Sequence, residues 1–170
     1  MNAGSRFAIG FAMTLGMAGT AAIADVDVTY DEPDRFTDAA DRNADPRHIA
    51  EDLRTHLQML DRRYPGAGRQ LRIHILDIDR AGRPRDNMPT ELRVMNGKAD
   101  WPCIELEWWV QGAIGESPHR RARICDIDYL SRPTGRYSEH DPLVYEKRML
   151  DGWFAARFGP ATVVSIQPAK

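Results

Sequence analysis

Apolar residues recur at helical spacing in two stretches of the chain. In the first stretch, Asp45-Pro46 pairs a capping residue with proline at the first helical position, and the pattern stops at Pro65-Gly66. In the second, Asp141-Pro142 repeats this arrangement, and a wide apolar stripe runs until Gly159-Pro160. These patterns predict two amphipathic helices, each with one apolar face that is suited to covering a sheet.

Alternating apolar and polar residues predict strands in much of the remaining sequence. Segment 81–89 is rich in Gly, Pro and Arg, which predicts an exposed loop. The two helices and these strands together predict an α+β fold, with a mostly antiparallel sheet of about four to five strands covered by the helices. The expected strands are 26–30, 70–78, 91–95, 103–111 and 119–129.

The last two predicted strands are separated by segment 112–118, which has the residues of a turn, so they should form an antiparallel hairpin. One register places Glu105 opposite Arg123 and also pairs apolar residues with apolar residues. The same register places Cys103 opposite Cys125, within reach of a disulfide bond. We therefore expect a cross-strand disulfide. A zinc site fits poorly, because the chain has only these two cysteines and no His at ligand spacing.

The N-terminus has the three parts of a secretory signal peptide. Arg6 supplies the positive charge, residues 7–19 form an apolar run, and Ala22-Ile23-Ala24 forms a cleavage site. The apolar run is shorter than the roughly 18–20 residues that a membrane span needs. We expect cleavage of residues 1–24 before Asp25, which leaves residues 25–170 as a single periplasmic domain without a transmembrane segment.

The charge balance gives no reason to expect nucleic acid as a partner. The chain has 23 basic and 25 acidic residues among 170, for a net charge of −2, and export would remove only one charged residue, Arg6. A domain that binds nucleic acid through its phosphates usually needs a surplus of basic residues. The expected partner is therefore an envelope protein or a small ligand.

Two Asp-Ile-Asp triplets follow apolar residues at the ends of predicted strands. Unless a bulge intervenes, Asp77 and Asp79 project from the face of the apolar residues before them, and so do Asp126 and Asp128. Four carboxylates at neighbouring strand ends could share a hard cation such as Ca²⁺ or Mg²⁺. Alternatively, they accept backbone N–H bonds in the turns that follow. The sequence leaves both interpretations open, and no other cofactor is predicted.

The catalytic motifs HExxH, GxSxG, GxGxxG and the P-loop do not occur in the chain. The sequence therefore favours a non-catalytic binding or accessory domain of the cell envelope. Its expected contact surface comprises Trp109 on the polar hairpin face, together with Arg83 and Arg85 in the loop. Two alternatives are a metal-dependent hydrolase that uses the four aspartates and a carrier of a small apolar ligand between helices and sheet.

The exported start and six internal segments resemble a bacterial family catalogued as domain of unknown function 3016. The resemblance covers nearly all of the mature chain, and the two cysteines and Arg80 are individual departures from it. It implies an envelope protein without an established activity, so it identifies no catalytic residue. The segments are 26–38 (VDVTYDEPDRFTD), 71–82 (LRIHILDIDRAG), 91–94 (ELRV), 102–110 (PCIELEWWV), 125–130 (CDIDYL) and 143–153 (LVYEKRMLDGW).

Overall fold

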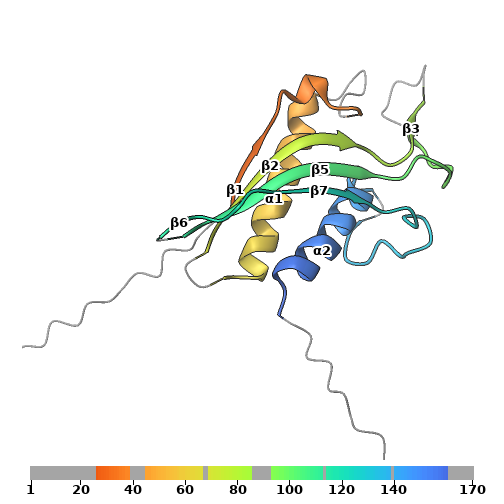
Figure 1. The fold of residues 1–170 in the computed structure, drawn as a ribbon. Helices are drawn as coiled ribbons and strands as arrows, with labels where there is room; N and C mark the ends of the chain where they lie inside the picture. The colour runs from red at the N-terminus through yellow and green to blue at the C-terminus, as the bar shows by residue number, and fades with distance from the viewer. Residues whose placement is uncertain are drawn as a thin grey trace, which may run out of the picture.

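In the computed structural model, two helices lie against one face of a five-stranded sheet (Figure 1). The helices are α1 (Pro46–Arg63) and α2 (Val144–Phe158). The predicted α+β fold is confirmed. The structure describes residues 26–38, 45–66, 69–85, 93–112, 114–138 and 140–160, and the predicted signal peptide lies outside them.

The main sheet runs in the order β1, β2, β5, and the last of these strands pairs with both β6 and β7. β1 is parallel to β2, whereas the other pairs are antiparallel, so the sheet is mixed with one parallel pair. Short strands β3 and β4 form a separate pair. The strands are β1 (Asp27–Tyr30), β2 (Gln70–Asp79), β3 (Arg83–Pro84), β4 (Arg93–Val94), β5 (Cys103–Gly112), β6 (Gly115–Glu116) and β7 (Arg120–Cys125).

The capping residue predicted for α1 is confirmed, because the Asp45 side chain accepts the backbone N–H of Arg47 at 3.0 Å. The second helix begins later than the sequence predicts. Asp141 instead caps a turn that precedes α2, where its side chain accepts the N–H of Leu143 at 2.9 Å and its carbonyl accepts that of Val144 at 3.2 Å.

The hairpin of β5 and β7 has the predicted register. Glu105 pairs with Arg123, and Cys103 pairs with Cys125. The two cysteine sulfur atoms lie 2.04 Å apart and form the predicted disulfide bond. β7 is shorter than predicted and ends at Cys125. The Asp126 N–H still donates to the Pro102 carbonyl, in the register of the hairpin, and residues 127–131 then form turns.

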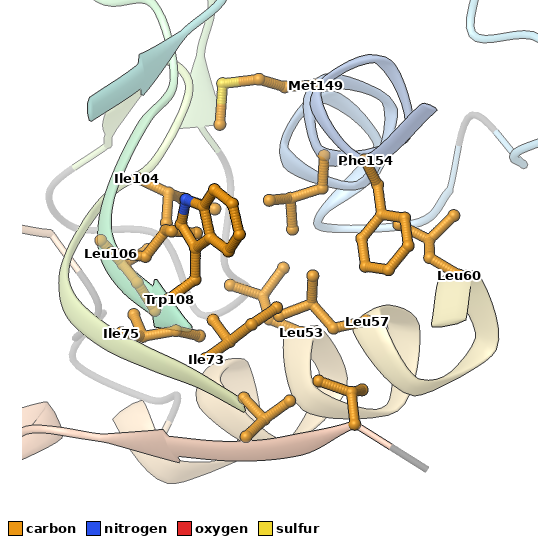
Figure 2. Packing of buried hydrophobic residues seen from close by; sticks show 14 of the residues in the cluster. Leu53, Leu57, Leu60, Ile73, Ile75, Ile104, Leu106, Trp108, Met149 and Phe154 are labelled. Carbon is orange, nitrogen blue, oxygen red and sulfur yellow. The ribbon is translucent and has the colours of Figure 1, made fainter. Parts of the chain in front are cut away.

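The hydrophobic core fills the space between the helices and the sheet (Figure 2). Side chains from α1 and α2 pack there against the apolar residues of β2 and β5. These side chains fill the space between helices and sheet that was considered for a small apolar ligand. Among the described residues, no helix is long and apolar enough to cross a membrane. The labelled core residues are Leu53, Leu57, Leu60, Ile73, Ile75, Ile104, Leu106, Trp108, Met149 and Phe154.

Candidate functional site

A bulge in β2 changes the face on which the end of that strand presents its side chains. The pairing of β2 with β5 shifts by one residue between Ile75 and Asp77. Ile78 is therefore buried, as Ile75 is, while Asp77 and Asp79 project from the polar face of the sheet. These aspartates were expected to share the face of Ile75 unless a bulge intervened, and the bulge places them on the opposite face.

The first aspartate pair contacts the segment that follows β1, and not the turn after β2 in which the alternative placed its bonds. The Asp77 carboxylate accepts both the backbone N–H and the hydroxyl of Thr37, each at 2.7 Å. Asp79 lies beside Asp38, with which it forms an isolated parallel bridge. Burial raises the pKa of Asp79, and the negative charges of Asp38 and Asp77 raise it further. These residues tie the N-terminal segment to the end of β2.

The second aspartate pair lies apart from the first. Asp126 is buried on the helix side of the sheet, where it contacts Arg148 at 3.1 Å and Arg132 at 3.3 Å. Asp128 is exposed. Within the described part of the chain, no group of three or more His, Cys, Asp or Glu side chains is arranged to hold a metal ion. The structure thus removes the geometric basis for a hydrolase built on the four aspartates.

The predicted contact residues lie at opposite ends of the sheet. Trp109 is on the polar face, as expected, and it stacks on His119 with 4.1 Å between ring centroids. It pairs with Arg72 near the start of β2, whereas Arg83 and Arg85 are exposed beyond the end of that strand. They therefore form no continuous surface with Trp109. The two ends of the sheet have to be considered separately.

At the end of β2, the Arg93 side chain connects several segments of the chain. Its guanidinium group forms an ion pair with Asp38 and donates to the carbonyls of Ala81 at 2.8 Å and Gly82 at 2.9 Å. Only 6 % of the Arg93 side chain is exposed, so the pair is largely shielded from water. Gly82 has a positive φ of 72°, and a Cβ there would meet the Met95 sulfur, so the sharp turn requires glycine.

Glu146 on α2 completes this buried network. Its carboxylate accepts the N–H of Ala81 at 2.7 Å, and its side chain is enclosed by protein. Burial raises the pKa of Glu146, although the Ala81 N–H and the positive charges of Arg80 and Arg93 oppose that increase. The helix is thereby joined directly to the turn that follows β2.

Arg148, two residues after Glu146 on α2, holds the segment between β7 and α2. Its guanidinium group donates to the Asp126 carboxylate at 3.1 Å and to the carbonyls of Arg132 at 2.7 Å and Pro133 at 3.1 Å. It also donates to the carbonyl of Tyr129. We call segment 126–143 the strap, and its residues 126–133 are therefore fixed to the helix by one side chain at several points.

A cavity of about 550 Å³ opens between the strap, the turn after β2 and the N-terminal end of α2. We call it the strap pocket. Its volume is in the range of small-molecule sites. Five of the six segments on which the family resemblance rests contribute to the network around it, through Asp38, Ala81, Arg93, Asp126 and Glu146. The lining residues are Arg80, Arg93, Met95, Thr134, His140, Asp141, Pro142, Val144 and Tyr145.

A second, smaller cavity of about 260 Å³ lies beside a cluster around Asp151 on α2. The buried His56 places its Nε2 3.1 Å from an Asp151 oxygen, and the Tyr137 hydroxyl donates to the other oxygen at 2.7 Å. Arg136 donates to Asp151 at 2.8 Å. Burial alone would raise the pKa of Asp151, but the bonds from His56 and Tyr137 outweigh it, so this pKa lies below the ordinary value.

Sequence reasoning singled out Asp126, but not Glu146 or Arg93, the two side chains that hold the turn after β2. Glu146 offered a signal, because it stands three residues after Leu143 and four before Leu150, within the apolar stripe of the second helix. A charged residue at such a position is rarely buried unless it has a partner. Arg93 offered none, because its partners become neighbours only when distant segments fold together.

Comparison with known proteins identifies the family but no characterised relative. No curated protein and no solved structure matches the chain. The family model described as "Protein of unknown function (DUF3016)" matches residues 24–156, which include the whole buried network and the strap. The resemblance stated from the sequence is thus confirmed, and the chain belongs to the family DUF3016.

Proposed function

We propose that this chain is an exported, non-catalytic binding domain of the bacterial cell envelope, and that its strap pocket binds a small organic or inorganic anion. The observation that carries the proposal is a pocket of ligand-binding size whose mixed lining includes two arginines, a histidine and two hydroxyl groups. The export component follows from the predicted signal peptide.

The lining residues support an anionic ligand. The guanidinium groups of Arg80 and Arg93 bring permanent positive charge to the wall of the pocket, and that of Arg93 also holds Asp38 and backbone carbonyls. Thr134 and Tyr145 add hydroxyl groups that can donate. The carboxylate that lines the pocket, from Asp141, is already paired with the Lys147 ammonium group at 2.8 Å. An oxyanion would therefore meet the hydroxyl groups of Thr134 and Tyr145 beside the positive charge of the arginines.

The fixed position of the walls also supports a binding role. Arg93 is held by Asp38 and by backbone carbonyls, and Arg148 fixes the strap, so the site is largely formed before a ligand arrives. A preformed pocket loses little conformational entropy when it binds its ligand. The common catalytic motifs are absent from the sequence. This favours a protein that binds a ligand over an enzyme that converts it.

Isothermal titration calorimetry with citrate and with inorganic phosphate tests this proposal on protein recovered from the periplasm. We expect one of these probes to bind, and we expect Tyr145→Phe and His140→Ala each to weaken its binding roughly 3- to 10-fold, the effect of losing one hydrogen bond or charge. His48→Ala is the matched control, because His48 is exposed on α1 and does not line the pocket. Binding that is equally weakened by His48→Ala, or no binding of either anion, would argue against the site.

A further inference from the structure

The end of the sheet opposite the strap pocket gathers aromatic side chains around the hairpin. Trp108 on β5 packs against Trp153 and Phe158 of α2, with ring centroids 6.4 Å and 5.3 Å away. Trp109, on the other face of the same strand, stacks on His119. Three of the four tryptophans of the chain therefore lie at this end, which we call the tryptophan end.

Two exposed arginines lie over the Trp108 ring. The guanidinium carbon of Arg120 lies 5.5 Å from the ring centroid, and that of Arg157 lies 5.4 Å from it. Neither arginine forms an ion pair with another described residue, whereas Arg72 nearby is paired with Asp27 at 3.2 Å. The two positive charges are thus held close to one indole and directed toward solvent.

The tip of the hairpin carries an apolar side chain in full contact with water. Ile114 stands in the turn between β5 and β6, and its side chain is completely exposed. Figure 1 shows this tip projecting beyond the helices. Arg120 pairs with Trp108, four residues before the end of β5, so the arginines over this ring are set back from the tip.

We propose that the tryptophan end docks on an anionic lipid surface, with Ile114 entering the headgroup region and Arg120 and Arg157 contacting lipid phosphates. Arginine favours the boundary between water and lipid, because its long cationic side chain reaches the phosphates, whereas Trp108 itself stays in the core and supports the two arginines. This inference is independent of the proposed ligand, since it uses no residue of the strap pocket.

The shape of this end favours lipid over a protein partner. A stable protein interface buries about 800 Å² on each side. A narrow projecting tip offers little such area, but it can enter a headgroup layer. Two carboxylates moderate the attraction, because Glu107 and Glu116 lie 3.2 Å and 3.7 Å from the His119 ring. The contact is therefore weak and reversible, and Glu116→Gln should strengthen it.

Vesicle sedimentation of the protein recovered from the periplasm tests this inference. We expect binding to vesicles of equal parts phosphatidylglycerol and phosphatidylcholine at low salt, weaker binding at high salt, and little binding to phosphatidylcholine alone. Ile114→Glu and the double variant Arg120→Gln with Arg157→Gln should each reduce binding at least 5-fold. These positions are exposed, so the variants should fold normally.

Two matched controls carry the same kinds of change at the other end of the sheet. Ile127→Glu alters another exposed isoleucine, 64 % accessible, and Arg83→Gln removes another exposed positive charge. Both should leave vesicle binding unchanged. Absence of binding to the anionic vesicles, equal binding to neutral vesicles, or equal losses in the controls would overturn the inference without affecting the proposed ligand site.

Discussion

Cys103 on β5 and Cys125 on β7 are directly opposite each other and joined by a disulfide bond, with their Cα atoms 4.2 Å apart. The bond closes the hairpin at the end that leads into the strap. The next residue, Asp126, is held by Arg148 of α2. The disulfide therefore fixes the chain at the point where the sheet is connected to the walls of the pocket.

Replacing both cysteines by serine should lower the free energy of unfolding by about 2–4 kcal/mol, because the unfolded chain regains the freedom that the cross-link removes. Urea unfolding of the oxidised protein and the double variant measures this difference. Thiol alkylation followed by non-reducing peptide mapping is the control. Two alkylated, unlinked cysteines in periplasmic protein would contradict the bond.

The Arg93–Asp38 pair should make a large contribution to stability. Arg93→Met leaves the Asp38 carboxylate, 18 % exposed, without its partner, and breaking a buried pair in this way costs about 3–5 kcal/mol. Arg83→Met, in the neighbouring short strand, is the control, and it should change stability by less than about 0.5 kcal/mol because that side chain is exposed. Equal effects of the two substitutions in chemical denaturation would disprove the role of the pair.

The Asp151 cluster should give stability a defined pH dependence. Because the pKa of folded Asp151 lies below its ordinary value, its contribution is complete above the unfolded pKa of about 4 and is lost as the pH falls through the folded pKa. Asp151→Asn should therefore cost about 1–3 kcal/mol at pH 7 and progressively less at pH values below about 4.

Thermal unfolding of the wild type and Asp151→Asn across this pH range measures the effect. Asp128→Asn, at an exposed position, serves as the control and should show no such trend. A difference between wild type and Asp151→Asn that stays constant down to the most acidic pH would show that Asp151 is not stabilised as a charged group.

Export predicts a mature N-terminus at Asp25, because the cleavage site Ala22-Ile23-Ala24 precedes it. Intact-mass analysis of the protein from a periplasmic extract gives the N-terminus directly. A membrane-bound species that retains Met1 would be inconsistent with a free periplasmic domain.

Features that depend on local sequence could be predicted. Asp45-Pro46 marks the start of α1, and the alternation of charged, apolar and sulfur-containing residues determines the hairpin register, because only one offset satisfies all of these pairs. The disulfide follows from that register.

Features that depend on irregular backbone or distant contacts could not be predicted. The bulge before Asp77 changes the side of the sheet on which the last residues of β2 present their side chains. No residue type in that strand predicts the bulge. The contacts of Arg93 with Asp38 and of His56 with Asp151 join segments 55 and 95 residues apart, so local patterns do not reveal them. The strap pocket is formed entirely by contacts of this second kind.

Native mass spectrometry of the protein recovered from the periplasm tests the proposed binding function most directly. We predict a species heavier than the mature chain by the mass of one small anionic molecule. This species should disappear on denaturation and should be strongly reduced in Tyr145→Phe but not in His48→Ala. A spectrum that shows only the bare mature chain, or an adduct that Tyr145→Phe retains in full, would contradict ligand binding in the strap pocket.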